Sequence, residues 1–149
     1  MLKLDDQLCF ALYAASNAVM RAYRPLLAPI HLTYPQYLVM IALWQNGAAP
    51  VNELATRLKV GANAITPLVD QLEKSGYVYR ARSSADRRIV TVVLTSTGIQ
   101  LEEAATEAQR QVSCRTGMTE TGLNLLRGQL HALIDRITAG STPIDGLGS

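Results

Sequence analysis

Apolar side chains near the start of the chain recur with the period of an α-helix. Leu4, Leu8, Leu12 and Val19 are separated by four, four and seven residues, so they fall on one stripe of a helix. Proline cannot donate the backbone hydrogen bond that continues a helix. We therefore predict a first helix of about eighteen residues that ends before Pro25 and buries one face.

A second helix is predicted around a proline that follows two residues suited to a helix start. Thr33 and Tyr34 precede Pro35, and proline is tolerated in the first turn of a helix. The apolar run after Pro35 continues to about Gln45, and Gly47 ends the helix soon afterwards.

Two shorter helices joined by a tight turn follow. The pattern predicts helices over Val51–Leu58 and residues 62–75, with three residues between them and Gly76 as a C-terminal cap. Pro67 favours a second helix that begins close to Asn63, because proline would kink a helix that began much earlier. The pair is a candidate helix-turn-helix; the alternative is two helices that only pack together in a core.

The pattern then becomes that of a β-hairpin. Residues 77–82 and 89–94 are rich in Tyr, Val and Ile, and the six residues between them form a polar turn with two adjacent arginines. A basic hairpin therefore follows the second helix of the pair directly.

Helical periodicity returns after the hairpin. It predicts helices over residues 96–115 and 119–138, with Gly117 between them. Residues 140–149 are rich in Gly, Ser and Pro, and we predict that they are disordered.

The composition fits one globular domain. The chain has 149 residues, of which 48% are hydrophobic and 17% charged, which excludes a disordered chain and a disulfide-stapled miniprotein. Its longest apolar stretch, residues 37–44, is far shorter than the roughly twenty residues of a membrane span. The acidic N-terminus also lacks a signal-peptide pattern. We expect a cytoplasmic protein with no membrane partner.

Positive charge is concentrated in the middle of the chain. The formal net charge is +2, but residues 57–93 hold seven Lys and Arg against three carboxylates. Such a cluster favours contact with phosphates; the alternative is an ordinary solvated surface. Together with the helix pair and the basic hairpin, it predicts a winged helix-turn-helix, mainly α with a small β-wing, that binds DNA.

The hairpin carries a recognisable pattern. Residues 86–95 read DRRIVTVVLT and residues 72–78 read LEKSGYV, which resembles the wing signature of the MarR family of bacterial transcription regulators. The resemblance implies a repressor, not an enzyme, with one domain over residues 1–139. It further implies a homodimer in which helices over about residues 4–23 and 98–138 of both chains interleave, beside a winged helix-turn-helix over about residues 48–95.

The resemblance also assigns residues to DNA binding. Arg88 would enter the minor groove, where a narrow groove concentrates negative potential, and Asp86 would orient it; the alternative for Asp86 is a turn-forming role. Ala62 and Ala64 depart from the Ser and Thr of related regulators, so the bases that are read stay open. The residues predicted to contact DNA are Arg57, Asn63, Thr66, Gln71, Arg80, Arg82, Asp86, Arg87 and Arg88.

The two cysteines are too far apart in sequence for a CxxC motif, so they are either inert core residues or reactive thiols. The segments around Cys9, Tyr23 and Tyr34 are similar to those of the organic-hydroperoxide-sensing branch of the MarR family, OhrR. This resemblance implies that Cys9 is the peroxide-reactive thiol and that Tyr23 and Tyr34 hydrogen-bond its sulfur. It further implies that Cys114 forms an intersubunit disulfide with Cys9, which releases operator DNA.

Helix geometry adds one independent inference. Cys9 and Tyr23 are fourteen residues apart, about 21 Å along a straight helix, so the phenol must come from another chain. Tyr37, like Tyr13 and His31, is interpreted as packing or surface.

Three rival functions use the same sequence features. A phenolic or aromatic ligand could replace the cysteine chemistry in a MarR-type repressor, the two cysteines could serve a thiol peroxidase, or the helices could form a protein-interaction module. No metal-site or cofactor motif is present in the sequence, so we predict neither.

Overall fold

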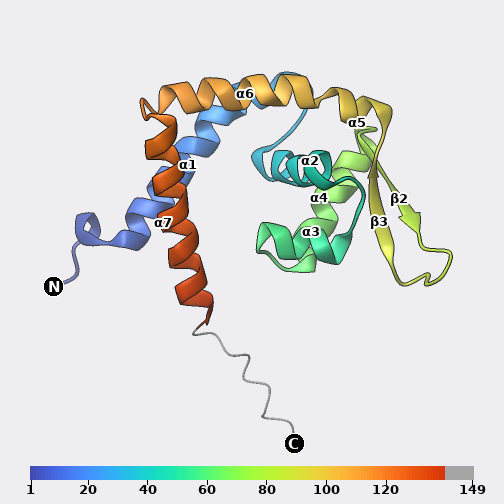
Figure 1. Ribbon diagram of the computed structural model, residues 1–149, viewed down its shortest axis with the longest axis horizontal. Coiled ribbons are helices and arrows are strands. Elements are labelled where there is room, and N and C mark those ends of the chain that lie inside the picture. The colour runs from blue at the N-terminus through green and yellow to red at the C-terminus, as the bar shows by residue number, and fades with distance from the viewer. Residues whose placement is uncertain (140–149) are drawn as a thin grey trace, which may run out of the picture. The chain divides into compact units, whose positions relative to one another are not determined.

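The computed structural model describes residues 1–139; the predicted disorder of residues 140–149 lies outside them. It confirms a mainly helical chain with a small antiparallel sheet of strand order β1-β3-β2 (Figure 1). The elements, in chain order, are η1 (Leu4–Asp6), α1 (Leu8–Leu27), η2 (Ala28–Ile30), α2 (Tyr34–Asn46), β1 (Ala49–Pro50), α3 (Val51–Leu58), α4 (Ala62–Lys74), β2 (Val78–Arg82), β3 (Val90–Leu94), α5 (Ser96–Gln100), α6 (Glu102–Arg115) and α7 (Glu120–Ala139).

The first helix differs from its prediction at both ends. Residues Leu4–Asp6 form a separate 3-10 turn, and α1 continues through Pro25 to Leu27. The prediction that the helix ends before Pro25 is therefore wrong. Pro25 costs the helix only one backbone hydrogen bond, near its C-terminal end, whereas the two residues after it bring Leu27 into the core, where it is fully buried.

The second helix begins as its sequence indicates. The Thr33 hydroxyl accepts a hydrogen bond from the Gln36 backbone N–H at 3.4 Å, and the Gln36 side chain accepts one from the Thr33 N–H at 3.0 Å. This reciprocal capping box satisfies two N–H groups at the helix start. At the other end Gly47 has φ +77°, a conformation that favours glycine.

The structure confirms the helix-turn-helix and the hairpin. α3 and α4 are joined through Lys59, which lies in the left-handed region at φ +58°. β2 and β3 pair antiparallel, with Arg80 opposite Val92. The short strand β1, which pairs Ala49 with Val92, was not predicted because two residues ending in proline carry no strand periodicity.

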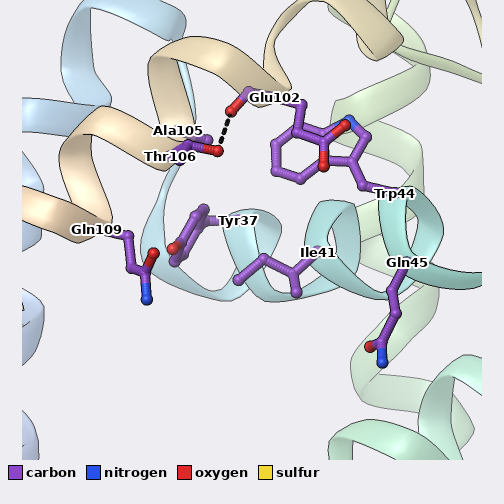
Figure 2. Close-up of a pocket in the computed structure, with 8 residues that line it drawn as sticks. All are labelled: Tyr37, Ile41, Trp44, Gln45, Glu102, Ala105, Thr106 and Gln109. Carbon is purple, nitrogen blue, oxygen red and sulfur yellow. Dashed lines mark hydrogen bonds between the residues drawn. The ribbon is translucent and has the colours of Figure 1, made fainter. Parts of the chain in front are cut away.

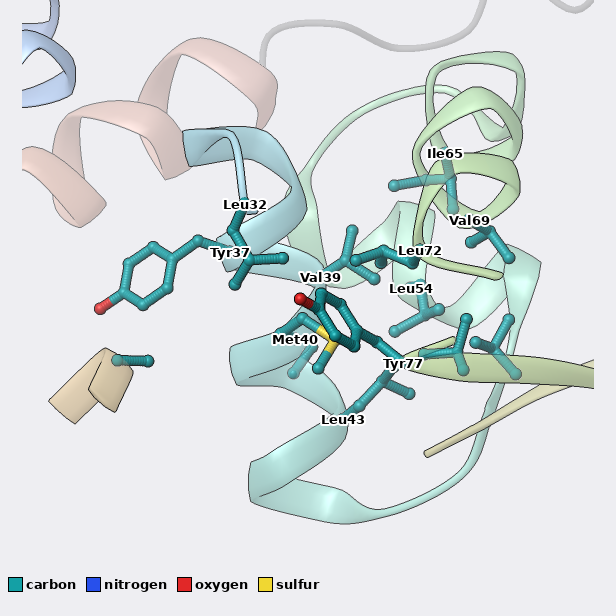
Figure 3. Packing of buried hydrophobic residues seen from close by; sticks show 14 of the residues in the cluster. Leu32, Tyr37, Val39, Met40, Leu43, Leu54, Ile65, Val69, Leu72 and Tyr77 are labelled. Atoms are coloured by element: carbon teal, nitrogen blue, oxygen red, sulfur yellow. The ribbon is translucent and has the colours of Figure 1, made fainter. Parts of the chain in front are cut away.

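The core lies where α2, α3, α4 and the sheet meet (Figure 3). Met40 and Leu43 come from α2, Leu54 from α3 and Leu72 from α4, and all four are fully buried. The Tyr77 hydroxyl donates to the Ile30 carbonyl at 2.9 Å, so its polar end is satisfied. This packing fixes α4 and the wing on one body.

Helix α5 is attached to that body by a short chain of hydrogen bonds. The Thr95 hydroxyl accepts from the Gly98 N–H at 3.1 Å and donates to the Gly76 carbonyl at 2.6 Å. The Gly98 carbonyl accepts from the indole N–H of Trp44 at 2.9 Å. Gly98 lies so close to the Tyr77 carbonyl oxygen that a Cβ at this position would overlap it.

The chain divides into two compact units, Met1–Val112 and a second that begins at Ser113. In the second unit, α7 buries none of its own side chains, and Leu125 and Ile137 are well exposed. In the first unit, α1 similarly exposes Leu8 and Leu12. Both helices therefore carry apolar surface that the described residues do not cover.

Among residues 1–139, no single helix is long and apolar enough to cross a membrane. Leu8–Ile30 and Tyr34–Asn46 reach that length and composition only as a pair, with a bend of 71° between them.

Candidate functional site

The outer face of α4 presents the polar residues that the sequence analysis singled out. Ile65, Val69 and Leu72 anchor the helix in the core. Because a helix turns every 3.6 residues, Asn63 and Gln71 lie on other faces, where they are exposed. The exposed surface of α4 therefore carries small side chains near the start of the helix, at Ala62 and Ala64, as well as side chains that can form hydrogen bonds.

The wing brings Arg88 and Asp86 together. The Arg88 Nε and Nη2 atoms each lie 3.1 Å from an oxygen of Asp86, and the Arg88 backbone N–H donates to the same carboxylate at 3.0 Å. These hydrogen bonds hold the pKa of Asp86 below its usual value. The Arg88 side chain is 91% exposed while that of Asp86 is 35% exposed, so the carboxylate aims a guanidinium that faces solvent.

The loop before Arg88 is held by its own hydrogen bonds. The Ser83 hydroxyl accepts from the backbone N–H groups of Ala85 and Asp86 at 3.2 and 3.3 Å. Arg82 donates through Nη1 to the Arg87 carbonyl at 3.1 Å. Two of the predicted DNA contacts, Arg82 and Asp86, thus also shape the turn.

Arg80 is engaged with α4. Its guanidinium lies 2.6 Å from Asp70 and 2.6 Å from Glu73, and it reaches the Thr66 carbonyl at 3.5 Å. This arrangement ties strand β2 to the exposed side of α4 and offsets one of the two negative charges of the carboxylates there. A DNA contact by Arg80 stays a prediction.

Arg57 is also engaged with its own chain. It donates to the Ala42 carbonyl at 3.1 Å and to the Gln45 side chain at 2.8 Å, both in α2. Arg57 thus attaches α3 to the C-terminal part of α2, where its positive charge also complements the helix dipole. Its DNA contact likewise stays a prediction.

A cleft of about 530 Å³ separates the helix-turn-helix from the wing. Thr66 lies on one side of it and Arg88 on the other. Asn52, in the first turn of α3, also lines it. Asn52 was not among the residues predicted from the sequence, because its position in the cleft depends on how the wing folds over α3.

Both cysteines are thiols with exposed side chains. Cys9 lies in the first turn of α1, in the first unit, and Cys114 lies near the end of α6, in the second. Their disulfide therefore stays a prediction. Among the described residues, no group of three His, Cys, Asp or Glu side chains could hold a metal ion.

Tyr23 and Tyr34 lie together, and Tyr37 joins them. The ring centroids are 5.2 Å apart for Tyr23 and Tyr34, 5.1 Å for Tyr23 and Tyr37, and 5.8 Å for Tyr34 and Tyr37. Tyr37 was predicted to be a packing or surface residue, although its three-residue spacing from Tyr34 places both on one helix face. Cys9 and Tyr23 lie fourteen residues apart on the single continuous helix α1, so Cys9 cannot reach the Tyr23 hydroxyl of its own chain.

Burial keeps the three phenols protonated. It raises the pKa of Tyr23, and a hydrogen bond with Tyr37 raises it further. Burial also raises the pKa values of Tyr34 and Tyr37. The cluster therefore offers neutral hydroxyl donors to a neighbouring anion.

A second hollow, of about 380 Å³, lies between α2 and α6 (Figure 2). Tyr37, Ile41 and Trp44 supply its apolar side. Across from them, the Thr106 hydroxyl donates to the Glu102 carbonyl at 2.8 Å. Tyr37 thus belongs both to this hollow and to the tyrosine cluster.

Comparison with known proteins gives consistent results. The MarR family profile matches residues 32–90. The chain is 43% identical to the HTH-type transcriptional regulator TtmR of Methylorubrum extorquens, over 95% of this chain and 73% of that protein. It is 32% identical to an organic hydroperoxide resistance transcriptional regulator of Bacillus subtilis, over 91% of this chain and 92% of that protein.

Solved structures resemble the fold over most of its length. Reduced AbfR bound to DNA is 30% identical and superposes with a TM-score of 0.76, covering 91% of this chain and 94% of that one. AbfR with a disulfide formed gives a TM-score of 0.66 at 32% identity, covering 89% and 92%. The match of family, fold and length leads to one conclusion: the chain belongs to the MarR family and is a DNA-binding transcriptional regulator.

Proposed function

We propose that the chain is a homodimeric repressor that senses organic hydroperoxides at Cys9 and leaves its operator when an intersubunit disulfide forms with Cys114. One observation carries the redox part of this proposal. Each subunit has an exposed thiol, Cys9, and a cluster of phenols that includes Tyr23. Cys9 and Tyr23 are too far apart on α1 for the thiol to reach the Tyr23 hydroxyl of its own chain. A second copy would supply the missing partner to each cluster.

The chemistry needs a thiolate. The Cys9 sulfur attacks one peroxide oxygen, an S–O bond forms as the O–O bond breaks, and the alkoxide takes a proton to leave as an alcohol. Hydrogen bonds from Tyr23 and Tyr34 stabilise the thiolate before the attack. The Cys114 thiolate of the other subunit then attacks the sulfenic sulfur; the S–S bond forms as the S–O bond breaks, and the hydroxide that leaves takes a proton to become water.

Dimer formation is supported by the apolar side chains that α1 and α7 expose among residues 1–139, which include Leu8, Leu12, Leu125 and Leu126. Burial of such surface favours association. A two-fold dimer would place two copies of α4 in successive major grooves, so the operator would be a pseudo-palindrome with half-sites about one helical turn apart. Both DNA and reduced thiols are available in the cytoplasm, where we place the repressor.

Fluorescence anisotropy on the DNA upstream of the protein's own gene tests this function. Reduced protein is expected to bind, to release after stoichiometric cumene hydroperoxide, and to bind again after dithiothreitol. Cys9→Ser is expected to stay bound after oxidant, because no sulfenic acid forms. Cys114→Ser is expected to release incompletely or without recovery, because nothing captures the sulfenic acid.

Other outcomes would replace the proposal with one of its rivals. Full release of Cys9→Ser by hydroperoxide would contradict the cysteine mechanism. Binding by a wild-type protein that ignores the oxidant would leave a DNA-binding repressor controlled by a small ligand, for which the hollow beside Trp44 is the place to search. Multiple turnovers of hydroperoxide with a reductant would indicate a thiol peroxidase, and absence of salt-dependent DNA binding would indicate a protein-interaction module.

The ion pairs of Arg80 lead to a prediction with a counterintuitive sign. Replacing Asp70 by Asn together with Glu73 by Gln removes two negative charges from a helix proposed to face DNA. Operator affinity is nevertheless expected to fall, by about 1 kcal/mol or roughly fivefold, because β2 loses its attachment to α4. Affinity for unrelated DNA is expected to rise, since non-specific binding follows net charge.

Anisotropy titrations of both DNAs at several salt concentrations would separate these effects. Tighter operator binding by the double variant would mean that the freed Arg80 contacts a phosphate. Arg80 would then belong to the DNA-contacting residues.

A further inference from the structure

We propose that Tyr37 is a positioning residue of the sensor, which holds the Tyr23 hydroxyl in line for the Cys9 sulfur of the partner subunit. This inference rests on the proposed function. It adds to that function a third phenol, one that does not touch the reacting sulfur itself.

The contacts of Tyr37 place it behind Tyr23. Its ring lies 5.1 Å from that of Tyr23, a distance typical of interacting aromatic pairs, and its side chain is only 4% exposed. Tyr23 comes from α1 and Tyr37 from α2, so the pair also joins the two helices. In Figure 3 the Tyr37 ring points away from Met40 and Leu43, at the margin of the core.

Hydroxyl chemistry allows this contact to carry a hydrogen bond as well as ring packing. A phenol has one proton to donate and an oxygen that can accept. In the single subunit the hydrogen bond between the two side chains raises the pKa of Tyr23, whereas for Tyr37 it partly offsets the increase caused by burial. The ring contact brings the two side chains together, and either hydroxyl can serve as the donor in the single subunit.

A thiolate from the partner subunit would fix the direction of hydrogen bonding. A hydrogen bond to an anion is about twice as strong as one between neutral groups, so the Tyr23 proton turns to the sulfur. The Tyr23 oxygen is then left as an acceptor, and Tyr37 donates to it. Hydrogen bonds in such a chain polarise one another, so Tyr37 makes Tyr23 a better donor to the thiolate.

The location of Tyr37 keeps its hydroxyl close to solvent-accessible space despite its burial. The ring forms one wall of the hollow between α2 and α6, where Figure 2 shows it between Ile41 and Gln109. Tyr34, by contrast, is only partly buried and lies one turn earlier on α2. The hydrogen-bonded hydroxyl groups, here called the relay, therefore begin at Tyr37 beside the hollow, continue to Tyr23 and end at the sulfur.

The test removes one oxygen atom. Tyr37→Phe is made in a Cys114→Ser background, and the rate of Cys9 alkylation by iodoacetamide is followed against pH. The midpoint of this profile is expected to move up by about half a pH unit, and sulfenic acid formation with cumene hydroperoxide at neutral pH is expected to slow about threefold. Operator binding by the reduced protein, which also reports correct folding, is expected to stay unchanged.

A second variant makes the opposite change. A ring-fluorinated tyrosine at position 37 is a more acidic phenol and a stronger donor, so the midpoint is expected to move down and the reaction to speed up. Tyr79→Phe is the matched control, because it removes the same atom from a side chain that is 48% exposed on β2. It is expected to match the parent in both readouts.

The outcomes distinguish this inference from the function on which it rests. If Cys9 responds to hydroperoxide in the parent protein but neither substitution at position 37 moves the profile or the rate, the role of Tyr37 is wrong and the sensor stands. If the parent protein shows no Cys9-dependent response, the proposed sensor itself fails. A faster reaction in Tyr37→Phe would mean that Tyr37 competes with the sulfur for the Tyr23 proton, which also overturns the relay.

Discussion

Replacing Gly98 by alanine is expected to destabilise the protein by about 3 kcal/mol, at the upper end of the cost of overpacking. The added Cβ would overlap the Tyr77 carbonyl oxygen and press on the Leu94 side chain. Backbone cannot rotate away as a side chain can. Relief therefore requires α5 to move, which stretches the hydrogen bonds of Gly98 to Trp44 and Thr95.

Urea unfolding at a fixed protein concentration would measure this loss, because the stability of a dimer depends on concentration. Thr97→Ala is the matched control: it lies one residue earlier in α5 and is exposed, and a surface substitution of this kind changes stability by less than about 0.5 kcal/mol. Equal unfolding midpoints for Gly98→Ala and Thr97→Ala would show that α5 is not held tightly against Tyr77.

Arg88→Ala is expected to weaken operator binding by about 1–3 kcal/mol, roughly fivefold to 150-fold. The guanidinium is exposed and oriented by Asp86, and an arginine in a narrow minor groove interacts with concentrated negative potential. Losing one phosphate-neutralising charge also lowers the slope of log affinity against log salt by about one. Anisotropy across a salt series gives both quantities.

Two further variants separate orientation from charge. Arg87→Ala removes the same charge from the adjacent position, so it is expected to lower the salt slope but to cost less discrimination between operator and unrelated DNA. Asp86→Asn retains an acceptor for the Arg88 backbone N–H but loses the charged pair. If Asp86 acts through Arg88, the two substitutions will not add; additive losses would assign Asp86 a separate role in the turn.

Local signals predicted much of the fold. Period, prolines and glycines were enough to place α2, α3, α4 and the hairpin, because each of these signals acts within a few residues. The continuation of α1 past Pro25 could not be predicted in this way. It depends on the burial of Leu27 among side chains that are distant in the sequence.

In the candidate site, too, local contacts could be predicted from the sequence and contacts between separate elements could not. The Asp86–Arg88 pair is local, two residues apart, and the sequence pattern indicated it. The partners of Arg80 are ten and seven residues away, on another element, and Tyr37 reaches Tyr23 from a separate helix. The sequence therefore indicates that Arg80 is a cation that could bind DNA. It does not indicate that Arg80 forms ion pairs with Asp70 and Glu73 in the folded chain.

The indole of Trp44 is an intrinsic fluorescent probe of movement between α2 and α5. It is the only tryptophan in the chain, and its N–H is bonded to Gly98, at the point where α5 follows the wing. The emission colour of an indole depends on its hydrogen bonding and on the polarity around it. Any movement that separates α2 from α5 should therefore appear as a red shift in intrinsic fluorescence, so that a stopped-flow instrument could time the motion without an attached dye.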